Sequence, residues 1–358
     1  MRKVFCRIIL VTGLVATTIW LASLVFNFYD GRTQSVVAPA QPYQELIKMF
    51  EYDRSARLDL AEDSTGEEDG AMVHDITYAS PRGGRVTATL VTPLTKGREV
   101  GLIFAHGAGG RRRDFLPEAL LFAKAGAVSL LIDDPSVRPS KWRREIHDFG
   151  KPGQARAGFI QAIIDLRRGV DLLSTRPDVN PNRLGFVGFS FGATLGGILC
   201  GVEQRIQAYA LMGGGLRLTE FLQRRYPQFA QDAYIRATAA FNVVNYIGHA
   251  SPAAVLYQFG RQDANMPEQD ALEFYRFGPE PKDILWWDGD HRLNTEATRH
   301  RVEWFHNKLG SDLLAPAVLR TKPSIATWGL ILAVIAFCLV KFFKRAKNFR
   351  IEKKIDVC

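Results

Sequence analysis

The chain has 358 residues, 47% of them hydrophobic, and a formal net charge of +9. A chain of this length can bury an ample core in one large domain or two small ones. The charge is concentrated at the ends, because residues 1–7 carry +3 and residues 341–358 carry +5, which leaves +1 on the other 333 residues. The nearly neutral central part argues against nucleic acid as a partner.

Each basic end adjoins an apolar run. Residues 8–28 contain no charged side chain, and at ~1.5 Å per residue this run is long enough to cross a bilayer. Residues 324–340 are also uncharged, and Phe342 and Phe343 follow them. We expect a transmembrane anchor at 8–28 and a second transmembrane helix at 324–343. A cleaved signal peptide and a buried core helix are the respective alternatives.

Basic residues beside a membrane span favour its cytoplasmic side. We therefore expect the basic tails 1–7 and 344–358 to be cytoplasmic and the domain between the spans to be extracytoplasmic, with membrane lipid as a partner. The sequence has no Asn-x-Ser/Thr sequon, which favours a bacterial inner membrane over a glycosylated lumen. Of the four cysteines only Cys200 lies in this domain, so no disulfide within the domain is expected.

The segment before the main domain, residues 29–71, is expected to be a linker and a peripheral segment. Within it, residues 43–60 have the pattern of an amphipathic helix, and residues 61–70 are acidic and predict a solvated loop. Residues 72–79 and 85–92 then have the pattern of two strands joined by a Pro-Arg-Gly-Gly turn.

From residue 100 onward, short apolar runs alternate with helix-like segments. The expected strands are 100–105, 127–132, 183–189, 206–212, 253–259 and 283–287, and the expected helices are 114–126, 154–175, 193–202, 268–277 and 296–309. Continuous apolar strands predict an α/β domain over residues 72–312, with a mostly parallel sheet and helices on both faces. In such sheets ligands bind beyond the carboxyl ends of the strands, so the residues found there matter most.

One strand end carries a Gly-x-Ser-x-Gly pattern. The strand 183–189 stops at Ser190, which Gly188 and Gly192 flank, and a helix-like run follows. This is the context of a nucleophile elbow, a turn so tight that the serine backbone is strained and side chains on either side would collide. The alternative is a buried turn that contains an incidental serine.

Two further strand ends supply the partners that a serine nucleophile needs. Asp263 follows the strand 253–259, and His291 follows the strand 283–287. A histidine can take the serine proton and return it to the leaving group, and a carboxylate can orient that histidine. Asp288 and Asp290 are alternatives for the acid, but they are too close in sequence to reach behind the ring easily. No second cluster of ligand residues supports a metal site, so we expect no metal and no cofactor.

The loop 106–110, His-Gly-Ala-Gly-Gly, follows the strand expected beside the elbow strand. An oxyanion hole needs two backbone N–H groups that point at the developing negative charge. We expect one from Phe191 and the other from Ala108, with Gly109 as the alternative. His106 is expected to be structural. Neither glycine-rich phosphate-binding pattern is present, which argues against a phosphate site.

Together, residues 106–110, 188–192, 260–263 and His291 resemble the α/β-hydrolase superfamily. The phrase Asp-Val-Asn-Pro-Asn-Arg-Leu-Gly-Phe-Val-Gly-Phe-Ser-Phe-Gly-Ala at 178–193 is similar to the dienelactone-hydrolase-like and prolyl-oligopeptidase-like branches. The resemblance covers roughly residues 72–309 and implies an eight-stranded, mostly parallel sheet. The dienelactone branch often has a cysteine nucleophile, and the serine here favours an esterase. No propeller domain precedes the fold, which disfavours an oligopeptidase.

Two insertions over the strand ends are expected to determine specificity. One is 135–153, which contains Trp142, and the other is 215–252, a possible lid that contains Tyr226. We expect Phe189, Trp142 and Tyr226 to bind substrate, although ordinary packing is the alternative for aromatic side chains. The arginine run 111–113 favours either an anionic group or simple solvation.

The sequence therefore predicts a membrane-anchored serine hydrolase of carboxylic esters, acting on a small-molecule ester or acyl substrate. A membrane-associated peptidase or thioesterase is the enzymatic alternative. A non-catalytic hydrolase-fold binding module is the alternative from another class.

Overall fold

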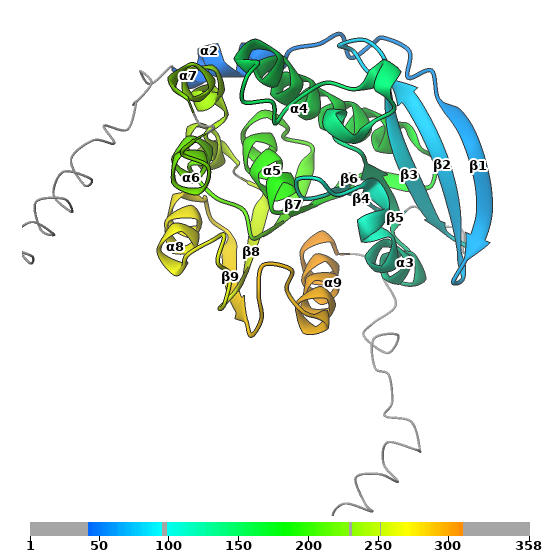
Figure 1. Cartoon of the computed structure of the whole chain (residues 1–358). Helices are drawn as coiled ribbons and strands as arrows, with labels where there is room; N and C mark the ends of the chain where they lie inside the picture. The colour runs from blue at the N-terminus through cyan, green and yellow to red at the C-terminus, as the bar shows by residue number, and fades with distance from the viewer. Residues whose placement is uncertain (1–41, 95–98, 229–230, 251, 311–358) are drawn as a thin grey trace, which may run out of the picture.

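A computed structural model of the chain describes residues 42–94, 99–228, 231–250 and 252–310. In this part the strands form one sheet of nine, in the order β1-β2-β3-β5-β4-β6-β7-β8-β9 (Figure 1). The first four strands of this order pair antiparallel, and all later pairs are parallel. The strands are β1 (Ala61–Glu68), β2 (Ala71–Ala79), β3 (Arg85–Pro93), β4 (Glu99–Ala105), β5 (Val128–Ile132), β6 (Val179–Phe189), β7 (Ile206–Met212), β8 (Ala254–Gly260) and β9 (Lys282–Trp287).

Helices cover both faces of the sheet. The α-helices are α2 (Tyr43–Ile47), α3 (Leu116–Lys124), α4 (Pro152–Thr175), α5 (Phe191–Val202), α6 (Leu218–Arg225), α7 (Asp232–Thr238), α8 (Glu268–Phe277) and α9 (Thr295–Leu309). Short 3-10 turns are η1 (Lys48–Phe50), η2 (Arg112–Phe115), η3 (Pro135–Val137), η4 (Ser140–Trp142), η5 (Ala239–Phe241), η6 (Val243–Asn245) and η7 (Ile247–His249). Figure 1 shows α4 and α5 on one face, and α3 and α9 on the other.

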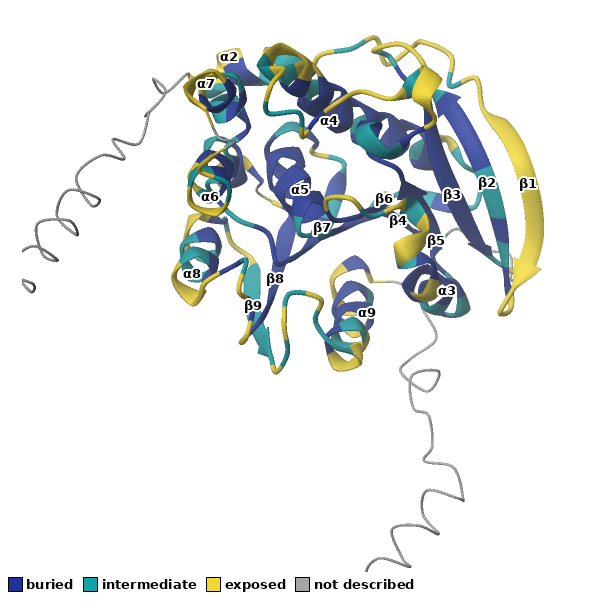
Figure 2. Ribbon diagram, in the orientation of Figure 1, coloured by how far each residue is buried: buried dark blue, intermediate teal, exposed yellow. Residues whose placement is uncertain are grey.

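The two faces of the sheet bury separate apolar clusters because successive strand residues point to opposite sides. In β4, Ile103 joins the cluster that packs against α4 and α5, whereas Leu102 and Phe104 join the cluster that contains α3 and α9 residues. The central strands and the inner sides of these helices are buried in Figure 2. The parallel strands are therefore apolar on both sides, as their continuous apolar sequences predict.

Two expectations for the segment before the domain are wrong. Residues 61–70 form no loop: β1 pairs with β2, which gives nine strands where the resemblance implies eight. Every residue of β1 is exposed, so its sequence lacks the alternation that marks a strand (Figure 2). The available signal was Asp69-Gly70, both at positive φ, because Asp-Gly is a strong hairpin turn.

The helix expected over 43–60 is also shorter than predicted. It consists of α2 and η1, and the chain after Phe50 is not helical. The guanidinium of Arg167 donates to the Phe50 carbonyl at 2.7 Å, and that of Arg168 donates to the carbonyls of Arg54 and Ala56. These bonds satisfy the backbone of an extended segment against α4, which removes the need for helical hydrogen bonds.

Among the residues that the structure describes, no helix has both the length and the apolar character needed to cross a bilayer. The expected spans at 8–28 and 324–343, and both basic tails, lie outside those residues.

Candidate active site

Ser190 occupies a strained turn between β6 and α5. Its backbone has φ 53° and ψ −112°, and its N–H donates to the Met212 carbonyl at 2.7 Å. A Cβ on Gly188 would lie 2.5 Å from the Gly192 carbonyl oxygen, and a Cβ on Gly192 would lie 2.0 Å from the Ala105 carbonyl oxygen. Glycine is therefore required at both positions, which is the geometry that the Gly-x-Ser-x-Gly spacing predicts.

The structure brings together the three side chains expected to act as a unit. The His291 Nε2 atom lies 2.8 Å from the Ser190 Oγ, and the His291 Nδ1 lies 2.7 Å from the Asp263 Oδ2. Because a carboxylate only accepts hydrogen bonds, Nδ1 carries the proton and Nε2 is free to accept the serine hydroxyl. The imidazole is thus in the tautomer that a general base requires.

The Asp263 carboxylate and the His291 ring are both held in place. The Asp263 side chain is 1% exposed, and its Oδ1 accepts the N–H groups of Asn265 and Met266 at 2.8 and 3.0 Å. A Cβ on Gly213, which has φ 57°, would lie 2.9 Å from the ring of His291. The ring of Phe189 packs against the ring of His291 in a tilted contact, with 4.9 Å between the ring centroids. The imidazole therefore has little room to turn away from Ser190.

The loop after β4 lies beside the elbow, because β4 pairs parallel to β6. His106 is buried, and its Nε2 accepts the Asp134 N–H at 3.2 Å while its Nδ1 donates to the Gly107 carbonyl at 2.8 Å. Ala108 and Phe191 line the cavity in front of Ser190, whereas Gly109 does not. Within the described ranges, neither the Ala108 nor the Phe191 amide donates to a protein acceptor. Both amides are therefore available to an oxyanion.

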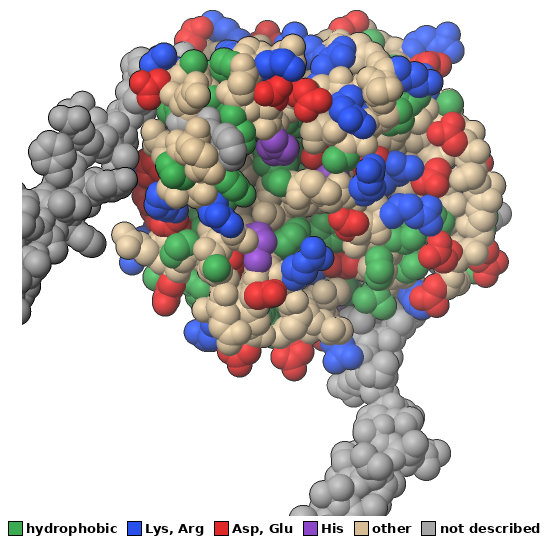
Figure 3. All heavy atoms as spheres, viewed as in Figure 1, with side chains coloured by type: hydrophobic (Ala, Val, Ile, Leu, Met, Phe, Trp, Pro, Cys, Tyr) green, Lys and Arg blue, Asp and Glu red, His purple; other side chains and the backbone are tan. Residues whose placement is uncertain are grey.

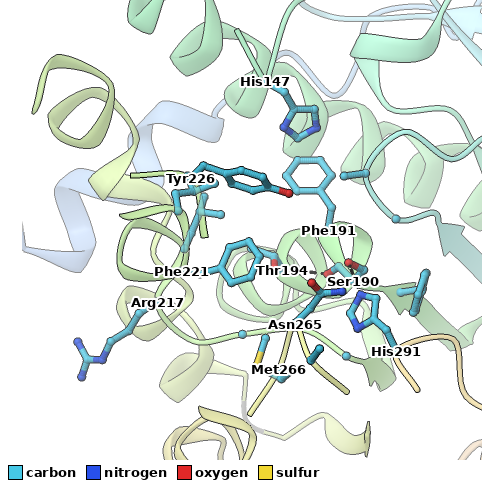
Figure 4. A pocket seen from close by; sticks show the side chains of 18 of the residues that line it. His147, Ser190, Phe191, Thr194, Arg217, Phe221, Tyr226, Asn265, Met266 and His291 are labelled. Carbon is cyan, nitrogen blue, oxygen red and sulfur yellow. Dashed lines mark hydrogen bonds between the residues drawn. The ribbon is translucent and has the colours of Figure 1, made fainter. Parts of the chain in front are cut away.

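A cavity of about 630 Å³ opens at Ser190 and His291. Figure 3 shows it as a hollow with apolar side chains inside and histidines at its rim. Phe189 and Tyr226 line this cavity, but Trp142 does not, because its ring packs 3.2 Å from where a Cβ on Gly84 of the β2–β3 hairpin would lie. His147 also lines the cavity and was not predicted from the sequence; its ring meets that of Phe191 edge-on at 4.8 Å between centroids (Figure 4). Its place in the insertion 135–153 was the available signal.

The charged residues near the site serve mainly the surrounding structure. In the arginine run, Arg112 pairs with Asp133, and Arg113 pairs with Asp75 at 3.1 Å. Asp290 accepts the Arg292 N–H at 2.9 Å, so it orders the loop around the histidine. Basic and acidic side chains are interspersed over the face seen in Figure 3. No group of metal-ligating side chains occurs in the part of the chain that the structure describes.

Comparisons with known proteins establish the fold. No family model and no curated protein matches the sequence. Among solved structures, acetyl xylan esterase 1 from Thermoanaerobacterium sp. JW/SL YS485 matches with a TM-score of 0.61 and 18% identity over 76% of this chain and 96% of its own. The chain has the α/β-hydrolase fold.

Other α/β-hydrolase structures agree. Acetyl xylan esterase from Paenibacillus sp. R4 matches with a TM-score of 0.62 and 18% identity over 74% of this chain and 93% of its own. An esterase from an Arctic intertidal metagenomic library matches with a TM-score of 0.55 and 16% identity over 69% of this chain and 97% of its own. At such identities the α/β-hydrolase likeness concerns the fold, so the activity must be argued from the site.

Proposed function

We propose that this protein is a serine hydrolase that cleaves carboxylic esters through an acyl-enzyme formed on Ser190. The hydrogen-bonded chain from Ser190 through His291 to Asp263, at the mouth of an apolar cavity, is the observation that carries the proposal. Esterases among the similar structures support ester hydrolysis as the reaction.

The geometry supports a two-step mechanism. The Ser190 Oγ attacks the ester carbonyl carbon while the His291 Nε2 takes the hydroxyl proton. The oxygen of the tetrahedral intermediate accepts hydrogen bonds from the N–H groups of Phe191 and Ala108. The carbon–oxygen bond to the alcohol then breaks, and His291 gives its proton to the leaving oxygen. Asp263 stabilises the imidazolium and keeps its carboxylate charge throughout.

Water completes the cycle by the reverse sequence. His291 takes a proton from the water as its oxygen attacks the acyl carbon, and the same two amides hold the oxyanion. The bond to the Ser190 Oγ then breaks, and His291 returns the proton to the serine. These steps use only side chains and amides of this chain, so they need no cofactor.

A peptidase or a thioesterase would form the same acyl-enzyme on Ser190. The three enzyme classes differ only in the leaving group, which is an alcohol for an esterase, an amine for a peptidase and a thiol for a thioesterase. The experiment is to present one acyl group as an ester, an amide and a thioester to the wild-type protein and to Ser190→Ala. We expect Ser190-dependent hydrolysis to be fastest for the ester. Faster cleavage of the amide or the thioester would contradict the proposed class, and hydrolysis of none of them would favour the non-catalytic binding module.

We also propose that the domain is tethered to a membrane at both ends, with both termini cytoplasmic. The two apolar runs and their basic flanks support this arrangement. Reporter fusions at Cys358 and at a position within 42–310 test it, with a cytoplasmic signal expected for the first and an extracytoplasmic signal for the second. The opposite pattern, or recovery of the full chain in the soluble fraction, would contradict the proposal.

A further inference from the structure

The position of His291 indicates which part of a substrate enters the cavity. In the mechanism proposed above, the leaving alcohol must lie against the His291 Nε2, which protonates it. Figure 4 shows Phe221 and Tyr226 on the side of Ser190 away from His291. The acyl group, which points away from the leaving group, therefore extends toward the aromatic end of the cavity.

Aromatic rings from several elements form this end. The ring residues that line it are Phe149, Phe159, Phe191, Phe221, Tyr226 and Tyr234. They contact one another, with 6.1 Å between the ring centroids of Phe149 and Tyr226 and 5.6 Å between those of Phe159 and Phe191. Aromatic rings prefer further rings in tilted or edge-on contact. An acetyl group would fill only a small part of the 630 Å³ cavity and would touch few of these rings. An aromatic ring on a short alkyl chain would reach the aromatic end and contact the rings there.

Two polar side chains that line the cavity near its aromatic end, Tyr226 and His147, are free to bind a ligand. The hydroxyl of Tyr234 donates to the Ile146 carbonyl at 3.0 Å, but that of Tyr226 has no hydrogen-bond partner among the described residues. The same holds for the imidazole of His147. In Figure 4 the Tyr226 hydroxyl points into the cavity, and His147, which lines the same cavity, lies above it in this view. Desolvation lowers the pKa of His147, so its ring is neutral at pH 7, with one donor and one acceptor nitrogen.

We infer that the site, given the proposed ester hydrolysis, accepts arylalkanoyl esters whose ring carries a hydroxyl group. The substrate ring packs against the protein rings at the aromatic end of the cavity, and the substrate hydroxyl hydrogen-bonds to Tyr226 and His147. Such a pocket is apolar over most of its surface and uses a few polar groups to fix orientation. The acyl group thus differs from the acetyl group named for two of the similar structures.

The first experiment compares four 4-nitrophenyl esters on the full-length protein: acetate, octanoate, 3-phenylpropanoate and 3-(4-hydroxyphenyl)propanoate. We expect kcat/KM for 3-phenylpropanoate to exceed that for acetate by about tenfold or more. The hydroxylated ester should be faster than 3-phenylpropanoate by roughly threefold to tenfold, the net effect of one or two hydrogen bonds. Equal or faster hydrolysis of acetate or octanoate would overturn the inference.

The second experiment removes the tyrosine hydroxyl alone. Tyr226→Phe should lower the ratio of kcat/KM for the hydroxylated ester to kcat/KM for the unsubstituted ester, because one of the two hydrogen bonds to the substrate hydroxyl is lost while that to His147 remains. Tyr275→Phe is the matched control, because its ring packs against Tyr257 at 5.8 Å and it does not line the cavity. The concentration of active sites in each variant is measured by labelling with a fluorophosphonate, and kcat is calculated per labelled site. Protein that fails to fold therefore does not lower the measured kcat. An unchanged ratio in Tyr226→Phe would overturn the inference.

Failure of the inference is distinguishable from failure of the proposed function. Ser190-dependent hydrolysis with acetate preferred would leave the serine esterase standing and reject the arylalkanoyl pocket. If Ser190→Ala hydrolyses all four esters as fast as the wild-type protein, both are rejected together.

Discussion

The close approach of α5 to the end of β4 makes Gly192→Ala a sharp test of the elbow. The added Cβ would lie 2.0 Å from the carbonyl oxygen of Ala105 and 2.8 Å from that of His106. Both neighbours are backbone atoms, so no side chain can turn aside, and the helix and the loop must separate by more than about 1 Å. Overpacking of this kind costs roughly 1–3 kcal/mol, and alanine returns up to about 1 kcal/mol through helix propensity.

With the middle of that cost range, about 2 kcal/mol, less a gain of up to about 1 kcal/mol, we expect Gly192→Ala to lower the free energy of unfolding by about 1–2 kcal/mol. The same displacement moves the Ala108 amide relative to Ser190, and a misplacement of ~1 Å reduces activity by roughly 100-fold. Urea unfolding gives the first quantity, and kcat/KM for a 4-nitrophenyl ester gives the second.

Gly66→Ala is the matched control. It lies in β1, where an added Cβ has no atom within 4 Å, so activity should be unchanged and stability unchanged or higher by up to about 1 kcal/mol. If Gly192→Ala kept wild-type stability and activity, the contact between α5 and Ala105 would be wrong, and with it the reason for glycine at this position.

Two further substitutions test the supporting structure and the triad. Arg301→Ala removes the hydrogen-bonding partner of the buried Glu118 carboxylate, which Arg301 contacts at 2.6 and 2.8 Å. It should lower the free energy of unfolding by about 3–5 kcal/mol. Arg236→Ala, in an exposed ion pair with Asp232 at 3.9 Å, is the control and should lower it by about 0.5 kcal/mol. Equal losses in urea unfolding would contradict this ranking. Asp263→Asn should lower kcat by ~10⁴-fold with little change in stability, because the amide fixes the wrong tautomer of His291; a tenfold loss or less would show that Asp263 does not orient the base.

The strand ends could be predicted from sequence because each combines a buried strand with a local motif. Ser190, Asp263 and His291 each follow an apolar run, and parallel strands bring such ends to one edge of the sheet. The loop 106–110 was predictable for the same reason, since β4 lies directly beside β6. The site geometry then follows from the order of the strands.

The walls of the cavity could not be derived in this way. Phe149 and Tyr226 come from separate insertions, and only the fold brings their rings to 6.1 Å. An aromatic residue in an insertion can face the cavity or pack elsewhere, as Trp142 does beside Gly84. The strand β1 could not be predicted, because backbone hydrogen bonds to β2 hold it in place and all its side chains are exposed. Its sequence therefore has no apolar alternation to mark it as a strand.

The most direct test of the central claim is mass spectrometry of the protein after reaction with a fluorophosphonate. We predict one covalent adduct per chain, located on Ser190, with loss of ester hydrolysis in proportion to labelling and no adduct in Ser190→Ala. An adduct on another residue, or full hydrolysis by the completely labelled protein, would contradict the assignment of Ser190 as the nucleophile.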